Sequence, residues 1–236
     1  MDKTAVIVST YTGGINSEYK TALTKNLCQR LKFNSPYYLC LTSHSPIDVE
    51  TQKLCDGFVY DSDNSFQING LPKLISPFFT PDGEPTISGT NLTHGVAELT
   101  AVHNSLNYLE RFGFTHFFKM TYDCDPNLDY NALIYKAQSI MEQTNKSFIC
   151  SGWCGRYDAI GFLMFYSKID FFRKAFPLSE AEMYSDCFEL QTYEVVKKLG
   201  LLHEVYWHDD SYQNFLGYTI NDYANRGGTQ FRECIF

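Results

Sequence analysis

The sequence predicts an α/β protein with a doubly wound, Rossmann-like arrangement and a mostly parallel central sheet. Short β-branched and apolar runs, typical of strands buried on both faces, alternate with longer segments of helical periodicity. The order strand, helix, strand, helix, strand is the pattern of a parallel sheet with helices on its faces. With 236 residues, 44% of them hydrophobic, the chain is long enough for one sizeable core. We therefore expect a single domain over residues 1–236.

The first half of the chain begins with the run AVIVST at Ala5–Thr10, which we expect to be a buried strand. A helix should follow it, with Asn16 or Ser17 as the N-cap, because apolar residues then recur at every fourth position. These positions are Tyr19, Leu23, Leu27 and Leu31. The next elements expected are strands at Tyr37–Leu41 and Gly57–Tyr60, separated by a short helix at Val49–Leu54. The stretch Asn64–Thr93, rich in Pro and Gly, is interpreted as a loop near the ligand site.

The second half opens with a long helix over His94–Phe112, predicted by apolar residues at three- and four-residue spacing, and Gly113 should end it. The following strand begins at Thr115. Asp129 is a candidate N-cap for a helix whose apolar face contains Leu133, Ala137, Ile140 and Met141. The remaining elements expected are strands at Phe148–Cys150, Ile160–Tyr166 and Glu204–Trp207 and helices at Ile169–Phe176 and Cys187–Leu199.

Composition and charge exclude several classes of protein. A net charge of -8 disfavours nucleic acid as a partner, because nucleic-acid binding relies on neutralising phosphates. No run approaches the roughly 18 apolar residues of a membrane span, so we expect no integral membrane segment. The eight cysteines form no C-x-x-C pair and are interpreted as reduced thiols. A strand begins almost at the N-terminus without a signal sequence before it, and we therefore expect a cytoplasmic protein.

The most informative segment is Thr115–Asn127, THFFKMTYDCDPN, in which an apolar run ends in Asp123 and Asp125 and is closed by Pro126. The pattern D-x-D is short, and random placement in a chain this rich in Asp gives roughly one such pair. A second pair does occur, at Asp61–Asp63. Context distinguishes the pair at Asp123, because carboxylates at the end of a buried strand are costly unless a cation accompanies them. The segment therefore indicates a divalent-metal site.

In the order of its elements the chain resembles the GT-A fold of nucleotide-sugar-dependent glycosyltransferases. The resemblance covers most of the chain: a first strand ending in Ser9-Thr10-Tyr11, a third ending in Asp61, a long helix, and a strand ending in Asp123-Cys124-Asp125. It implies a nucleotide-sugar-binding half at about residues 1–125 and an acceptor-binding half at about 126–236. It further implies a hexosyltransferase-like enzyme that moves a sugar from a UDP or GDP donor to a glycan or small hydroxyl acceptor.

The same resemblance implies a role for particular residues. Asp125 and Asp123 would hold Mn²⁺ or Mg²⁺ against the diphosphate, since both ions prefer oxygen ligands. His208 would complete the metal shell, in competition with the neighbouring Asp209 and Asp210. The nucleoside would contact Thr10, Tyr11 and Asp61. Arg156, in a turn-like segment, is a candidate phosphate ligand on chemical grounds.

An inverting transferase also needs a general base, and the acceptor half offers Glu182, Asp186 and Glu189. We select Glu189, with Asp186 as the second candidate. The two glutamates also have a structural interpretation, because each ends a capping-box pattern, beginning at Ser179 and at Asp186. A retaining enzyme needs no such base, and the sequence does not distinguish the two courses.

Two other functions remain open. A nucleotidyltransferase that makes nucleotide-sugars would share the doubly wound design, but it usually has a Gly-rich basic loop after the first strand. The corresponding loop here, YTGGINSEYK, contains a single, late Lys. A non-catalytic carbohydrate- or nucleotide-binding protein of the same fold would have the same sequence pattern, and an assay separates it from an enzyme. The absence of G-x-G-x-x-G and of a P-loop motif argues against dinucleotide and P-loop enzymes.

Overall fold

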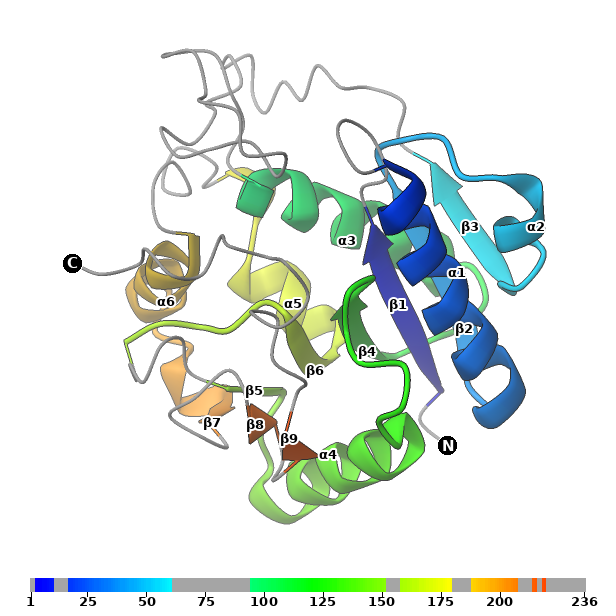
Figure 1. Ribbon diagram of the computed structural model, residues 1–236. Coiled ribbons are helices and arrows are strands. Elements are labelled where there is room, and N and C mark those ends of the chain that lie inside the picture. Colours follow the sequence, from blue (N-terminus) through cyan, green and yellow to red (C-terminus); the bar gives the residue numbers. More distant parts are fainter. Residues whose placement is uncertain are drawn as a thin grey trace.

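The computed structural model describes residues 3–10, 17–60, 94–151, 158–179, 188–207, 214–215 and 218–219. Within these ranges the chain forms three layers, with a central sheet between two layers of helices (Figure 1). The sheet contains β1 (Thr4–Thr10), β2 (Tyr38–Ser43), β3 (Gly57–Tyr60), β4 (His116–Thr121), β5 (Phe148–Cys150), β6 (Met164–Lys168) and β7 (Val205–Trp207). A separate short hairpin is formed by β8 (Asn214–Phe215) and β9 (Tyr218–Thr219).

The strand order in the sheet is β3-β2-β1-β4-β6-β5-β7. The β1–β2, β2–β3, β1–β4 and β5–β7 pairs are parallel, and β6 is antiparallel to both of its neighbours, β4 and β5. The strand order reverses between β1 and β4, since β2 and β3 extend the sheet on one side and the later strands extend it on the other. In open α/β sheets this switch point is where ligands bind, beyond the carboxyl ends of the strands.

Helices cover both faces of the sheet, and side chains alternate along each strand to meet them. One face packs against α1 (Ser17–Asn34) and α4 (Tyr130–Thr144), through residues such as Val6, Val8 and Phe118. The other face packs against α3 (His94–Glu110), α5 (Ile169–Ala175) and α6 (Phe188–Lys198), through residues such as Ile7 and Phe117. The short helix α2 (Val49–Gln52) and the 3-10 turn Leu202–Glu204 complete the elements. This arrangement confirms the predicted doubly wound α/β fold with a mostly parallel sheet.

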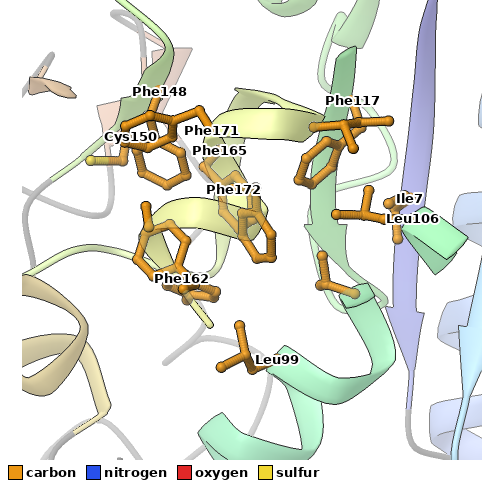
Figure 2. Packing of buried hydrophobic residues seen from close by; sticks show 14 of the residues in the cluster. Ile7, Leu99, Leu106, Phe117, Phe148, Cys150, Phe162, Phe165, Phe171 and Phe172 are labelled. Carbon is orange, nitrogen blue, oxygen red and sulfur yellow. The ribbon is translucent and has the colours of Figure 1, made fainter. Parts of the chain in front are cut away.

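Aromatic rings dominate the core on the α3, α5 and α6 side (Figure 2). Phe172 of α5 lies among the rings of Phe117, Phe162 and Phe165, with centroids 5.3, 6.1 and 5.5 Å away. Phe162 in turn packs on Phe188 at the start of α6, with the centroids 4.7 Å apart. This aromatic cluster joins β4, β6, α5 and α6, so the second half of the chain is fixed to the central strand by burial of large apolar surfaces.

Most predicted elements occur within a few residues of their expected bounds, and two predictions need correction. The strand expected at Ile160–Tyr166 begins only at Met164, because the preceding backbone bonds elsewhere: the N–H of Ile160 donates to the Glu189 carbonyl at 2.9 Å. In α1 the predicted apolar face is wrong at Tyr19, which is exposed. The buried face of that helix begins instead with the polar residues Lys20 and Thr24.

None of the described helices has the length and apolar composition needed to span a bilayer. The five described cysteines that the structure classifies, Cys28, Cys40, Cys55, Cys124 and Cys150, are all free thiols.

Candidate active site at the carboxyl end of β4

The D-x-D segment forms a turn directly after β4. The strand ends at Thr121, and the N–H of Cys124 donates to the Thr121 carbonyl at 3.1 Å. The N–H of Tyr122 donates to the Ser9 carbonyl at 3.0 Å, which extends the β1–β4 pairing one step beyond the strand. Asp123 therefore lies beside the carboxyl ends of both β1 and β4, at the point where the strand order reverses.

Asp125 is held by local hydrogen bonds on the way into α4. Its Oδ1 accepts from the backbone N–H of Asn127 at 3.0 Å and from the Asn127 side-chain amide at 3.1 Å. Its carbonyl accepts from the hydroxyl of Tyr130, the first residue of α4. Asp129 caps that helix, as predicted, by accepting from the N–H of Ala132 at 3.0 Å. The Asp125 side chain is thus positioned by a turn and a capped helix, and it is buried.

Asp123 is buried, and its environment disfavours the charged form. Burial raises the pKa of this carboxyl from 3.8 to about 6, and the negative charge of Glu98 adds to the rise. Hydrogen bonds from Thr121 and from its own backbone, together with the positive charge of Lys119, oppose it. A buried carboxyl with a raised pKa at the end of a strand is typical of a functional site rather than of a core.

A second group of charged residues lies beside this turn and was missed in the sequence. Lys119 of β4 is completely buried, forms an ion pair with Glu98 of α3, and donates to the carbonyl of Phe162. The Ser9 hydroxyl of β1 donates to the same Glu98 oxygen, Oε1, at 2.7 Å. We refer to Ser9, Glu98 and Lys119 as the Glu98 cluster. It links β1, α3 and β4 near the carboxyl ends of the two strands, on the side of the sheet where Asp123 lies.

The structure also places two other predicted residues. The Thr10 side chain is buried and its hydroxyl is hydrogen-bonded to that of Thr24 on α1, at 2.9 Å, so it lies between β1 and α1. Glu189 lies in the first turn of α6 and is half-buried, and its carbonyl accepts from the N–H of Ile160 and the Thr192 hydroxyl. The other candidates lie outside the described residues: Tyr11, Asp61, Arg156, Glu182, Asp186, His208, Asp209 and Asp210.

The chemistry of the turn fits a hard divalent cation. Asp123 and Asp125 supply carboxylate oxygens, which Mg²⁺ and Mn²⁺ prefer, and such ions commonly keep waters and substrate phosphates as further ligands. In the part of the chain that the structure describes, no group of three or more His, Cys, Asp or Glu side chains is arranged to hold a metal by itself. Asp123 and Asp125 would hold such an ion together with a phosphate-bearing ligand.

The raised pKa of Asp123 predicts that Asp123→Asn stabilises the metal-free protein. At pH 8 the folded state carries a buried charge that the unfolded state solvates freely, at a cost of about 3 kcal/mol for a pKa raised from 3.8 to about 6. As pH falls through 6 towards 4, the folded protein binds this proton before the unfolded chain does. The cost then disappears, and so should the advantage of the variant. Urea unfolding between pH 8 and pH 4, with chelator present, measures the difference.

Burial also lowers the pKa of His103, which makes folding less favourable as pH falls below the ordinary value of 6.5. This pH dependence of the free energy of unfolding is opposite in sign to that caused by Asp123. It is the same in the wild type and in Asp123→Asn, so their difference at each pH isolates the effect of Asp123. A variant that is less stable than the wild type at pH 8 would show that the Asp123 carboxylate contributes more to folding than its burial costs.

The fold class is thus an open, doubly wound α/β sheet with its candidate site at the switch point. No family model matches the sequence, and a search of curated proteins found no match. Similar solved structures include a cytidylyltransferase from Leptospira borgpetersenii, with a TM-score of 0.43 and 13% identity over 74% of this chain. This chain spans 64% of that protein, less than two thirds of its length.

Two further structures are similar at the level of the fold. One is a protein of Desulfovibrio desulfuricans described provisionally as a nucleotide-diphospho-sugar transferase, with a TM-score of 0.49, 12% identity, and coverage of 89% of this chain and 81% of that one. The other is core-mannan synthase A of Aspergillus fumigatus, in a Mn/GDP form, with a TM-score of 0.38, 9% identity, and coverage of 93% and 70%.

Proposed function

We propose that the protein is a metal-dependent glycosyltransferase that moves a sugar from a nucleoside-diphosphate donor to a hydroxyl of a glycan or small acceptor. We expect the transferred sugar to be a hexose. One observation carries the proposal. Two buried carboxylates, Asp123 and Asp125, occupy a fixed turn beyond the carboxyl end of β4, where the strand order of a doubly wound sheet reverses. For an acidic protein with a net charge of -8, a metal cation at this place would be the natural way to bind an anionic diphosphate.

Each residue of the turn has a part in this proposal. Asp123 and Asp125 would hold Mn²⁺ or Mg²⁺, which when bound supplies charge stabilisation for the departing nucleoside diphosphate. The bonds that Asn127 donates to Asp125 orient its carboxylate before the donor arrives, so little reorganisation is needed on binding. Thr10 would contact the nucleoside through its backbone, because its hydroxyl is hydrogen-bonded with Thr24.

The remaining roles rest on the predicted residues. Tyr11 and Asp61 would complete the nucleoside contacts, Arg156 would contact the diphosphate, and His208 would complete the metal shell. Glu189, with Asp186 as the alternative, would deprotonate the acceptor hydroxyl if the enzyme inverts configuration. Glu189 lies in the first turn of α6, and its carbonyl accepts from the N–H of Ile160 in the segment before β6. In this proposal α6 would lie on the acceptor side.

We place this activity in the cytosol. Free thiols at Cys28, Cys40, Cys55, Cys124 and Cys150 fit a compartment that keeps cysteines reduced.

The direct test is calorimetric titration of UDP and of GDP into the wild-type protein, with Mn²⁺ and with chelator. We expect one nucleotide to bind in the presence of the metal and to bind much more weakly after chelation. A screen of donor hydrolysis with sugars of the bound nucleotide should then reveal turnover. If neither nucleotide binds under any condition, the proposal is wrong for these donor classes. Release of pyrophosphate from a nucleoside triphosphate and a sugar phosphate would instead identify a nucleotidyltransferase, and binding without turnover would favour a non-catalytic protein.

A further inference from the structure

The Glu98 cluster contains a lysine in an unusual place. The side chain of Lys119 has no exposed surface, and its Nζ lies 5.9 Å from the centre of the Phe165 ring. Phe117, two residues before Lys119 on β4, faces the same side of the sheet. Its polar contacts are the Glu98 carboxylate and the carbonyl of Phe162. The ammonium group of Lys119 is therefore buried at the edge of an aromatic core.

Stability of the fold does not account for this lysine. Removing an ammonium from water costs several kcal/mol, and replacing a buried ion pair by well-packed apolar residues is often neutral or stabilising. Here the pair is also asymmetric, because Lys119 is buried completely while the Glu98 side chain keeps 24% of its surface exposed. The desolvation cost therefore falls mainly on Lys119. The ion pair holds the Glu98 carboxylate in place at the edge of the core.

The position of Glu98 is fixed from two strands at once. Ser9 and Lys119 approach the same oxygen, Oε1, from β1 and β4, which are adjacent parallel strands. Ser9 is paired in register with Thr121, the last residue of β4, and its carbonyl receives the N–H of Tyr122. Glu98 thus presents a fixed carboxylate beside the candidate site.

The charge of Glu98 restricts what it can bind. A carboxylate repels the phosphates of a nucleotide, and it accepts hydrogen bonds from neutral donors such as hydroxyl groups. A nucleotide-sugar offers such hydroxyls on two rings, the ribose and the transferred sugar. Hydrogen bonds to an ionised acceptor are roughly twice as strong as neutral ones, and a side chain held by its neighbours loses little entropy when it forms them.

We propose that Glu98 binds the donor by accepting hydrogen bonds from ring hydroxyls, and that Ser9 and Lys119 are positioning residues that hold its carboxylate for this purpose. This inference rests on the proposed function, since it assumes a nucleoside-diphosphate donor at the end of β4. It adds to that function a side of the site on α3 that contacts neutral hydroxyls, separate from the side on the β4 turn that would hold the metal and the diphosphate.

The test compares Glu98→Gln with the wild type in the presence of Mn²⁺, using whichever of UDP or GDP binds. The ligands are the diphosphate, its 2′-deoxy and 3′-deoxy forms, and a hexose ester of the diphosphate such as UDP-glucose or GDP-mannose. We expect the variant to bind the hydroxyl-bearing ligand about ten- to a hundredfold more weakly, the range for loss of a hydrogen bond to a charged group. Glu110→Gln is the matched control, because Glu110 lies on the same helix and pairs with Arg173 at the surface.

The two hydroxyl sources give different patterns. If Glu98 binds the ribose, Glu98→Gln should bind the nucleoside diphosphate more weakly than the wild type does, and the two proteins should bind one of the deoxy forms equally. If the transferred sugar is recognised, the diphosphate binds equally to both proteins and the loss occurs with the hexose ester alone. Either pattern supports the inference. Equal affinities of Glu98→Gln and wild type for every ligand, with metal-dependent diphosphate binding intact, overturn the inference and leave the proposed function standing. A wild type that binds no nucleotide overturns both.

Glu98→Gln leaves Lys119 buried without its counter-ion and could misfold for that reason. A second variant therefore serves as a control for folding. The double variant Glu98→Gln/Lys119→Met removes both charges and should fold, with the same loss of hydroxyl-dependent affinity. Lys119→Met alone keeps the carboxylate but loosens it. A positioning role predicts that this variant reduces the affinity ratio between the hydroxyl-bearing ligand and its deoxy or sugar-free form, whereas a purely structural role would leave that ratio unchanged.

Discussion

Asp125→Asn is expected to lower the rate of sugar transfer roughly 10²- to 10³-fold. A metal acting as Lewis acid contributes several kcal/mol to stabilising the charge of the leaving group, and about 1.4 kcal/mol corresponds to a factor of ten in rate. Asn keeps an oxygen that can accept the 3.0 Å bond from the N–H of Asn127, so the turn should be preserved. What is lost is the negative charge and one strong oxygen ligand. Steady-state kinetics with saturating donor, over a range of Mn²⁺ concentrations, measures the effect.

Asp129→Asn is the control for this variant. Asp129 is four residues further along and carries the same charge, but it caps α4, and Asn is as good an N-cap as Asp. It should retain full activity, which separates loss of a ligand from a change in local charge. Activity of Asp125→Asn within a factor of three of the wild type, at all metal concentrations, would remove Asp125 from the site and with it the central observation of the proposal.

Periodicity and strand order account for the elements that the sequence predicted well. The buried runs that became β1 and β4, the apolar stripe of α3 and the Asp129 cap all follow from local rules about which side chains face a core or satisfy a helix end. The predicted start of β6 was wrong because Ile160, four residues before the strand, is as apolar as a strand residue. The N–H of Ile160 instead donates to the Glu189 carbonyl in the first turn of α6. That partner is 29 residues away in sequence, and local patterns contain no information about it.

The Glu98 cluster was missed for a related reason. Lys119 interrupts an apolar run and resembles a residue at an exposed strand position, and only the packing of β6 and α3 on that face shows that it is buried. One signal was present: Glu98 precedes Val102 and Leu106 by four and eight positions, so it lies on the apolar stripe of α3. A carboxylate on a buried stripe together with a lysine inside a buried strand indicates an interior ion pair, even before the partners are known.

Phe172→Ala is expected to lower the free energy of unfolding by about 4 kcal/mol, the range for truncating a fully buried Phe. Phe172 has no exposed surface, and its ring is parallel to Phe165 at 5.5 Å and edge-on to Phe117 at 5.3 Å. It also contacts Phe176 at 4.9 Å, so its removal leaves a cavity that rigid neighbouring rings cannot collapse to fill. Urea unfolding should show a lower midpoint at an unchanged slope, and the melting temperature should fall by roughly 10 °C.

Phe33→Ala provides the comparison, because Phe33 lies near the end of α1 with 81% of its surface exposed and should cost little when truncated. A cost below about 1 kcal/mol for Phe172→Ala would contradict the packing of α5 on β4 and β6. The same cluster also reaches the site, since the Phe162 ring packs 6.1 Å from Phe172 and the Phe162 carbonyl accepts from Lys119. If the aromatic cluster holds the Glu98 cluster in place, Phe172→Ala should also weaken hydroxyl-dependent donor binding, whereas metal-dependent binding through the β4 turn should persist in the folded fraction.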